Sequence, residues 1–172
     1  MNIEVLKLGP LETNCYVLRK NQKVLIIDPA DEVLKIKNSI GNDELLGIIV
    51  THSHFDHIGA LNELLECYDT NVYDKNNLKE KEYNIGGFQF EVIYTPGHTD
   101  DSITIYFKQE KIMFVGDFVF KDSIGRTDLG GNIIEMKESI EKIKEYHDIL
   151  IYPGHGDSTN IDYEKENNYY FK

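Results

Sequence analysis

The chain has 172 residues, of which 41% are hydrophobic and 28% are charged, and its formal net charge is −12. These values are typical of a globular protein, and the length predicts one domain that buries ~70% of the surface of its unfolded chain. The negative charge argues against nucleic acid and against an anionic membrane surface as partners, because no run of Lys or Arg offsets it.

The composition also predicts a cellular compartment. Residues 1–7 lack the apolar core of a signal peptide, and no later stretch is apolar enough for a membrane span. The two cysteines, Cys15 and Cys67, are not paired by their spacing and do not lie near the histidines. We therefore expect both to be buried as small apolar residues in a reducing compartment, with the cytoplasm as the location.

The first half of the chain begins with strands. Residues 2–8 alternate between apolar and polar side chains, which predicts a first strand. A hairpin is expected next, with strands at 14–19 and 23–28. The Asp28-Pro29 step ends its second strand at the edge of the sheet where the connecting loops lie. Asp31 is expected to cap a short helix that follows.

A cluster of chemically active residues comes next. Three of the six histidines fall within the stretch 51–57, together with one aspartate. The apolar run 45–50 predicts a buried strand and residues 59–65 predict a helix, so the cluster lies at a strand-to-helix junction. Dense clusters of His and Asp are typical of metal sites. In a purely structural alternative, Asp56 caps the following helix, but this explains only one residue of the four.

The spacing within this cluster predicts which side chains bind each of two metal ions. Side chains two residues apart point the same way in an extended loop, so His52 and His54 are expected to face one ion together. Asp56 and His57 follow where the chain turns, and they can reach a second ion beside the first.

The second half of the chain is richer in short strands. The polar residues 75–84 are expected to form a loop, and the residues after His155 a short polar tail. A helix capped by Asn132 is predicted to run to about residue 146. Strands are predicted at 88–94, 102–107, 111–115 and 149–152. Two strand-rich halves that each carry helices predict an α+β fold, with two sheets packed face to face and helices outside.

More potential ligands directly follow predicted strands, each in a short glycine motif: Thr95-Pro96-Gly97-His98, Val115-Gly116-Asp117 and Pro153-Gly154-His155. Turns favour Pro, Gly and Asp, so each motif alone has a structural explanation. Together they place five of the six histidines and two aspartates at the ends of apolar strands, which favours one shared site. His147 follows a predicted helix end, and we assign it no chemical role.

This set of motifs resembles the metallo-β-lactamase superfamily, whose five metal motifs are matched in order by His52, His54, Asp56, His57, His98, Asp117 and His155. The resemblance implies a four-layer αβ/βα sandwich with its metals at one edge between the sheets, formed by residues 1–172 as a single domain. Asp117 stands where the true β-lactamases use Cys or Ser, and this is similar to the glyoxalase II (hydroxyacylglutathione hydrolase) side of the superfamily. The segment 123–128 also resembles small bacterial glyoxalase II-like hydrolases.

The sequence departs from glyoxalase II in two respects. That enzyme has a C-terminal helical domain that helps to hold glutathione, whereas 17 residues follow His155 here, and we expect no such domain. The segment between the first histidine cluster and His98 is also short compared with many relatives. Both departures predict a more open site that discriminates weakly between thiols.

The resemblance also implies roles for the ligands. One divalent ion would be held by His52, His54 and His98, a second by Asp56, His57 and His155, and Asp117 would lie between them. Two such ions can lower the pKa of a shared water from 15.7 toward ~7, and the bridging hydroxide would attack the carbonyl of a small thioester or ester. Asp56 is expected to orient this hydroxide as well as to act as a ligand.

Arg126 is a candidate for binding a substrate carboxylate, and an ion pair with Asp128 or Asp122 is the structural alternative. The ligand types suit two zinc ions, with iron or manganese as alternatives. The expected partner is a small-molecule substrate, and the expected state is a monomer or a homodimer.

Other functions within the superfamily remain as alternatives. Persulfide dioxygenases use a related ligand set with one iron, so a mononuclear iron oxidoreductase is the main alternative to a hydrolase. Because all seven ligand positions are filled, two metals are favoured. RNA processing is disfavoured by the charge of −12, and a non-enzymatic binding module is disfavoured because every ligand is retained.

Overall fold

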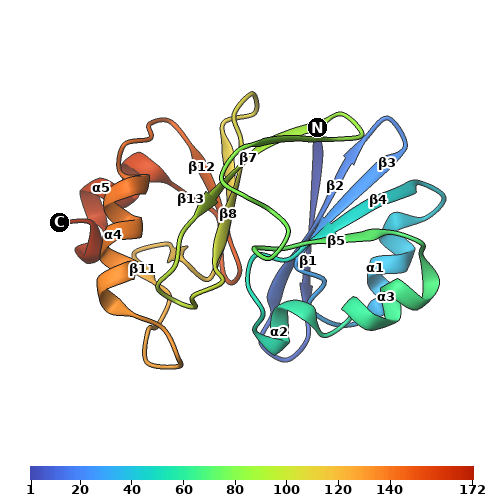
Figure 1. Ribbon diagram of the computed structural model, residues 1–172, viewed down its shortest axis with the longest axis horizontal. Helices are drawn as coiled ribbons and strands as arrows, with labels where there is room; N and C mark the ends of the chain where they lie inside the picture. The colour runs from blue at the N-terminus through green and yellow to red at the C-terminus, as the bar shows by residue number, and fades with distance from the viewer.

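The computed structural model describes residues 1–172, and it consists of two β-sheets packed face to face with helices on both outer faces (Figure 1). The first sheet has the order β1-β2-β3-β4-β5, and its strands span Asn2–Leu8, Thr13–Lys20, Lys23–Ile27, Glu44–Ile49 and Asn71–Tyr73. Strands β1 to β3 pair antiparallel, whereas β3, β4 and β5 run parallel to one another.

The second sheet has six strands in the order β13-β12-β9-β8-β7-β6. In chain order these strands span Glu82–Ile85, Phe88–Tyr94, Ile103–Phe107, Ile112–Gly116, Leu150–Pro153 and Thr159–Asn160. Only β9 and β12 pair in parallel, and the other neighbours are antiparallel. A separate two-stranded ribbon, β10 (Val119–Phe120) and β11 (Ser123–Ile124), follows β9.

Three apolar clusters hold four layers together. The central cluster lies between the sheets and includes Leu25 and Ile49 from the first sheet and Phe107 and Phe114 from the second. The first sheet packs on its other face against α1 (Val33–Ile40) and α3 (Leu61–Cys67). The second sheet packs against α4 (Ile133–Ile143) and α5 (Ile161–Asn167). This is the αβ/βα sandwich that the sequence predicted.

Most predicted elements are confirmed, and the differences have local causes. The helix expected at 59–65 begins at Leu61, and a separate turn of helix, α2 (Phe55–Ile58), carries part of the histidine cluster. The loop expected at 75–84 ends early, because β6 begins at Glu82 and pairs with β7. The expected polar tail is instead β13, α5 and the 3-10 helix η1 (Tyr169–Phe171), which packs Phe171 into the core.

Two smaller expectations were wrong. Asp31 does not cap α1, because the N-cap is Glu32 and no side chain accepts a hydrogen bond from the first turn. Cys15 is buried as expected, but Cys67 is exposed at the end of α3, and its sulfur lies 3.2 Å from Lys37 Nζ. None of the helices is long and apolar enough to cross a membrane.

The C-terminal helix α5 is fixed by a buried carboxylate. Glu164 has no exposed surface, and it accepts hydrogen bonds from Thr159 Oγ1, from Asn168 Nδ2 at 2.7 Å and from the Asp122 backbone N–H at 3.0 Å. Asp122 lies in the turn between β10 and β11, so Glu164 joins the last helix to this ribbon. A buried acidic side chain is tolerated here because three donors satisfy it.

We therefore expect Glu164→Ala to lower the free energy of unfolding by about 3 kcal/mol, because it leaves buried donors without an acceptor. Glu166→Ala, an exposed glutamate on the same helix, is the control and should change it by less than about 0.5 kcal/mol. Urea denaturation measures both. Equal unfolding free energies for the two variants would contradict the role given to Glu164.

Candidate metal centre

The seven predicted ligands converge at one edge of the sandwich, just after the ends of four strands. His52 and His54 lie in the loop after β4, and α2 follows with Asp56 and His57. The remaining three come from the second sheet: His98 from the loop between β7 and β8, Asp117 from the end of β9, and His155 from the end of β12. Apolar strands therefore fix where each ligand segment begins, and five of the ligands lie in short connecting segments, whereas Asp56 and His57 lie in α2.

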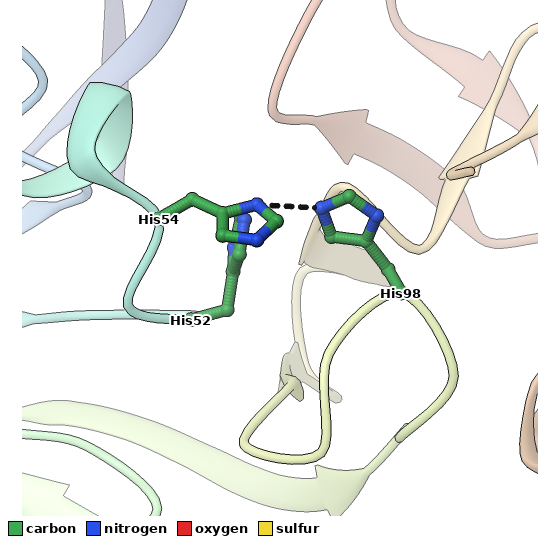
Figure 2. A group of neighbouring side chains, drawn as sticks. All are labelled: His52, His54 and His98. Atoms are coloured by element: carbon green, nitrogen blue, oxygen red, sulfur yellow. Dashed lines mark hydrogen bonds between the residues drawn. The ribbon is translucent and has the colours of Figure 1, made fainter. Parts of the chain in front are cut away.

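The first group of ligands consists of His52, His54 and His98, whose ring nitrogens lie within 4.8 Å of one another. Figure 2 shows that the first two rings come from one loop and meet the third ring from the opposite loop. Nδ1 of His54 and Nε2 of His98 are 2.9 Å apart. Three imidazoles at this separation match the ligand set of a transition-metal ion.

The second group consists of Asp56, His57 and His155, again with ligand atoms within 4.8 Å. The Asp56 Oδ2 atom lies 3.2 Å from His155 Nε2 and 3.6 Å from His57 Nε2. Asp56 accepts a hydrogen bond from Thr13 Oγ1 at 3.0 Å and lies inside α2, where His54 is the N-cap. The alternative in which Asp56 is only a helix cap is therefore wrong.

Asp117 lies between the two groups. Its Oδ1 is 3.2 Å from His57 Nε2, and its Oδ2 is 3.6 Å from His98 Nε2 and 3.5 Å from His155 Nε2. This carboxylate thus contacts the first group through one histidine and the second group through two. Such an arrangement allows one carboxylate to be shared between neighbouring ions.

Several buried atoms at the centre lack hydrogen-bond partners, and these are His52 Nε2, His57 Nε2 and Asp117 Oδ1. The last two are 3.2 Å apart, but they do not have the geometry of a hydrogen bond. An unsatisfied buried polar atom costs about 1–3 kcal/mol, so three in one place are rare in a protein without a ligand there. Asp117 Oδ1 and the Nε2 atoms of neutral imidazole rings offer lone pairs, and the side chains fit divalent metal ions.

The second ring nitrogen of each of four histidines is held by an oxygen. His57 Nδ1 lies 2.9 Å from Asp28 Oδ2, and His98 Nδ1 lies 2.7 Å from the Arg126 carbonyl oxygen. His155 Nδ1 contacts the Leu11 carbonyl oxygen at 3.1 Å, and the fourth contact joins His52 Nδ1 to the Thr51 hydroxyl at 3.2 Å. These contacts favour the tautomer that leaves Nε2 free to bind a metal ion.

Asp28 is the functional residue that the sequence analysis did not assign. It is buried at the end of β3, where its Oδ1 accepts a hydrogen bond from the Thr51 N–H at 2.8 Å. Its Oδ2 accepts from the Thr51 hydroxyl at 2.6 Å and also contacts His57. The Asp28-Pro29 step placed this carboxylate at the correct edge, but the same step is typical of an ordinary turn.

The surroundings shift the pKa values of several residues at the centre. Burial lowers the pKa of His52 to about 3, so its ring is neutral at neutral pH. Burial also acts to lower the pKa of His57, but Asp28 and Asp117 outweigh it and raise that pKa to about 10. Burial acts to raise the pKa of Asp117, but contacts with His155 and His57 hold it well below its usual range. A cation bound at His57 therefore displaces a proton.

Close approach at the centre requires glycine at position 154. A Cβ atom there would lie 2.1 Å from Asp117 Oδ1 and 2.6 Å from the His57 ring. The backbone of the loop that carries His155 can pass the two ligands only without a side chain.

Two other residues named from the sequence lie outside the ligand groups. The guanidinium of Arg126 is exposed and forms a bidentate ion pair with Asp128, with N–O distances of 2.8 and 2.7 Å. The side chain of Arg126 therefore forms the ion pair with Asp128 that was the structural alternative to substrate binding. The backbone carbonyl oxygen of Arg126 contacts His98. His147 is exposed, with its Nδ1 3.1 Å from Asp162 Oδ1, and it has no contact with the centre.

Known proteins resemble this chain over nearly its whole length. The probable metallo-hydrolase YqgX of Bacillus subtilis is 34% identical, in a match that covers 93% of this chain and 92% of that protein. The hydroxyacylglutathione hydrolase GloC of Haemophilus influenzae is 29% identical, and the match covers 98% of this chain and 97% of that protein.

Solved structures share the fold. The BLEG-1 B3 metallo-β-lactamase has a TM-score of 0.92 at 29% identity and covers 99% of both chains. ETHE1 from Myxococcus xanthus has a TM-score of 0.90 at 28% identity, covering 98% of this chain and 84% of that one. TTHA1623 in a di-iron-bound form has a TM-score of 0.86 at 28% identity, covering 97% of this chain and 99% of that one.

The family comparison agrees with the fold and with the ligand geometry. Residues 8–74 and 72–155 match the metallo-β-lactamase superfamily, and these ranges contain all seven residues that converge at the sheet edge. The chain belongs to the metallo-β-lactamase superfamily.

Proposed function

We propose that this protein is a dinuclear metal hydrolase that acts on a small thioester. The observation that carries the proposal is the position of Asp117 between two complete ligand groups. One ion would be held by His52, His54 and His98, and a second by Asp56, His57 and His155. An enzyme with one metal ion would need only one of these two ligand groups.

Divalent ions held by these residues would supply Lewis-acid chemistry, which can lower the pKa of a bound water from 15.7 toward ~7 and polarise a carbonyl oxygen. The protein's own groups position the reactants. The Asp56 carboxylate, held by the hydrogen bond from Thr13 Oγ1, would accept a hydrogen bond from the attacking water and so direct the lone pair of the water toward the substrate carbonyl. Asp28 keeps the His57 ring in one tautomer through its contact with Nδ1. The proposal needs no serine or cysteine nucleophile.

The class of substrate is supported by the relatives. GloC of Haemophilus influenzae is named a hydroxyacylglutathione hydrolase, and its match covers 98% of this chain. We propose zinc as the metal, because imidazole and carboxylate ligands suit it. Iron and manganese suit the same ligands, and TTHA1623 holds two irons on this fold.

The second candidate function is a mononuclear iron oxidoreductase. It is favoured by one observation, namely that His52, His54 and His98 form a group on their own, with Asp117 3.6 Å from His98 Nε2. The two candidates differ in the number of metal ions per chain and in the need for Asp56.

Asp56 provides the first test. We expect Asp56→Asn to lower kcat/KM for thioester hydrolysis by at least ~100-fold, because an amide is a poor ligand and a poor acceptor for the attacking water. The control is Asp157→Asn. The Asp157 side chain is 85% exposed, so kcat/KM of this variant should stay within about twofold of the parent value. Circular dichroism of both variants checks that the fold survives. Near-parent activity of Asp56→Asn on its best thioester would exclude this mechanism.

The pairing of Arg126 with Asp128 generates a prediction about the thiol half of the substrate. The guanidinium of Arg126 is exposed and is already neutralised by Asp128. We therefore propose that Arg126 contributes little to binding a thiol that carries carboxylates, such as glutathione. Arg126→Ala should change kcat/KM for a lactoyl thioester of glutathione by less than about threefold. The parent protein should prefer this substrate over the lactoyl thioester of N-acetylcysteamine by less than ~100-fold, which is ~2.7 kcal/mol. A larger preference that Arg126→Ala abolishes would show that the arginine binds the substrate carboxylate.

A further inference from the structure

A small cavity borders the metal centre on the side of Asp56. Its volume is about 190 Å³, and its lining comes from the β1–β2 turn, the segment after β3, and α2. Asp56 and Thr13 belong both to this lining and to the centre, because they are joined by the hydrogen bond described above. A larger cavity of about 310 Å³ lies along β6 and β7 and includes none of the seven ligands.

The walls of the cavity are mainly apolar. Leu8 and Ala30 are buried and form its floor, while Leu11 and Phe55 are 52% and 76% exposed and form its rim. Phe55 stands between two ligands in the chain, and the carbonyl oxygen of Leu11 contacts His155. The rim residues are therefore tied to the metal centre by the backbone. Two exposed apolar side chains therefore stand beside the second ligand group, where they are free to contact an apolar part of a substrate.

The floor is rigid as well as apolar. A Cβ atom at Gly59 would lie 2.3 Å from the Ala30 carbonyl oxygen, so α2 is packed closely against the segment after β3. The Ala60 N–H donates to the Pro29 carbonyl oxygen at 3.0 Å and holds the same two segments together. The cavity is thus preformed, and a ligand that enters it does not need to displace these segments.

Size and charge define what the cavity can take. An apolar cavity of about 150 Å³ holds benzene, so about 190 Å³ accommodates roughly six to eight non-hydrogen atoms. A tripeptide thiol such as glutathione is several times too large. The carboxylate of Asp31 also lines the cavity, and it disfavours an anionic group.

We propose that this cavity is the acyl subsite, and that it selects thioesters with an uncharged, unbranched acyl group of about four to six carbons. The proposal rests on the proposed thioester hydrolysis and adds the class of acyl group. The carbonyl lies at the metal centre, the acyl chain extends past Asp56 between Leu11 and Phe55, and the thiol half extends toward solvent.

A series of N-acetylcysteamine thioesters tests this subsite. From acetyl to butanoyl to hexanoyl, kcat/KM should rise about three- to fourfold for each added methylene, and it should not rise further with octanoyl. Leu11→Ala and Phe55→Ala should each lower the ratio of hexanoyl to acetyl activity by about tenfold. The control is Leu34→Ala on α1, which is 70% exposed and lies outside this lining, and which should keep the parent ratio. A flat series, or a ratio unchanged in both rim variants, overturns the proposal.

Binding measured without turnover separates this proposal from the proposed function. In the protein as purified, 1-hexanol should shift the backbone amide resonances of Leu11, Phe55 and Gly59, and Phe55→Ala should weaken those shifts by about tenfold. If no thioester is hydrolysed but these shifts appear, the thioester function fails and the apolar subsite stands. If thioesters are hydrolysed but chain length has no effect and hexanol causes no shift at these residues, the subsite fails alone.

Discussion

The structure depends on one buried carboxylate, that of Asp28. This side chain joins the ends of two neighbouring parallel strands, because it accepts hydrogen bonds from the backbone and hydroxyl of Thr51 and contacts the ring of His57. Asp28 holds a φ of 52°, in the left-handed region that costs a residue other than glycine about 1–3 kcal/mol. The three contacts offset that strain. They also fix the loop that carries His52 and His54 relative to α2, so two ligand groups share one rigid support.

The two halves of the sandwich meet at this same edge. Asn14 Nδ2 on β2 donates to the carbonyl oxygens of Pro153 and Gly156, each at 3.0 Å, on either side of His155. Asp117 then contacts ligands from both sheets. Burial opposes the ionised form of this carboxylate, and the nearby histidines favour it, so the centre is held in the charged form that attracts cations. The overall charge of −12 adds to this attraction, and it disfavours anionic substrates in the open parts of the site.

Much of the fold and of the candidate site could be predicted, because both depend on local patterns. The apolar runs predicted the strands, and the spacing of His52, His54, Asp56 and His57 predicted side chains that the structure brings together at one edge. Asp28 could not be assigned, since its partners lie 23 and 29 residues away and an aspartate before proline is ordinary in a turn. Helix α5 was missed because a glutamate at position 164 predicts a solvent-exposed segment, and the three donors that allow its burial come together only in the folded chain. The cavity was missed for the same reason, since Leu8, Ala30 and Phe55 meet only in the folded chain.

The central claim is that two complete ligand groups hold two metal ions on one chain. Elemental analysis of the purified protein measures this directly, with the number of metal ions counted per chain. We expect two ions in the parent protein and two in His147→Ala, which changes a histidine remote from the centre. His98→Ala and His155→Ala should each lose about one ion, because each variant lacks a ligand from a different group. A single iron per parent chain, unaffected by His155→Ala, would contradict the central claim.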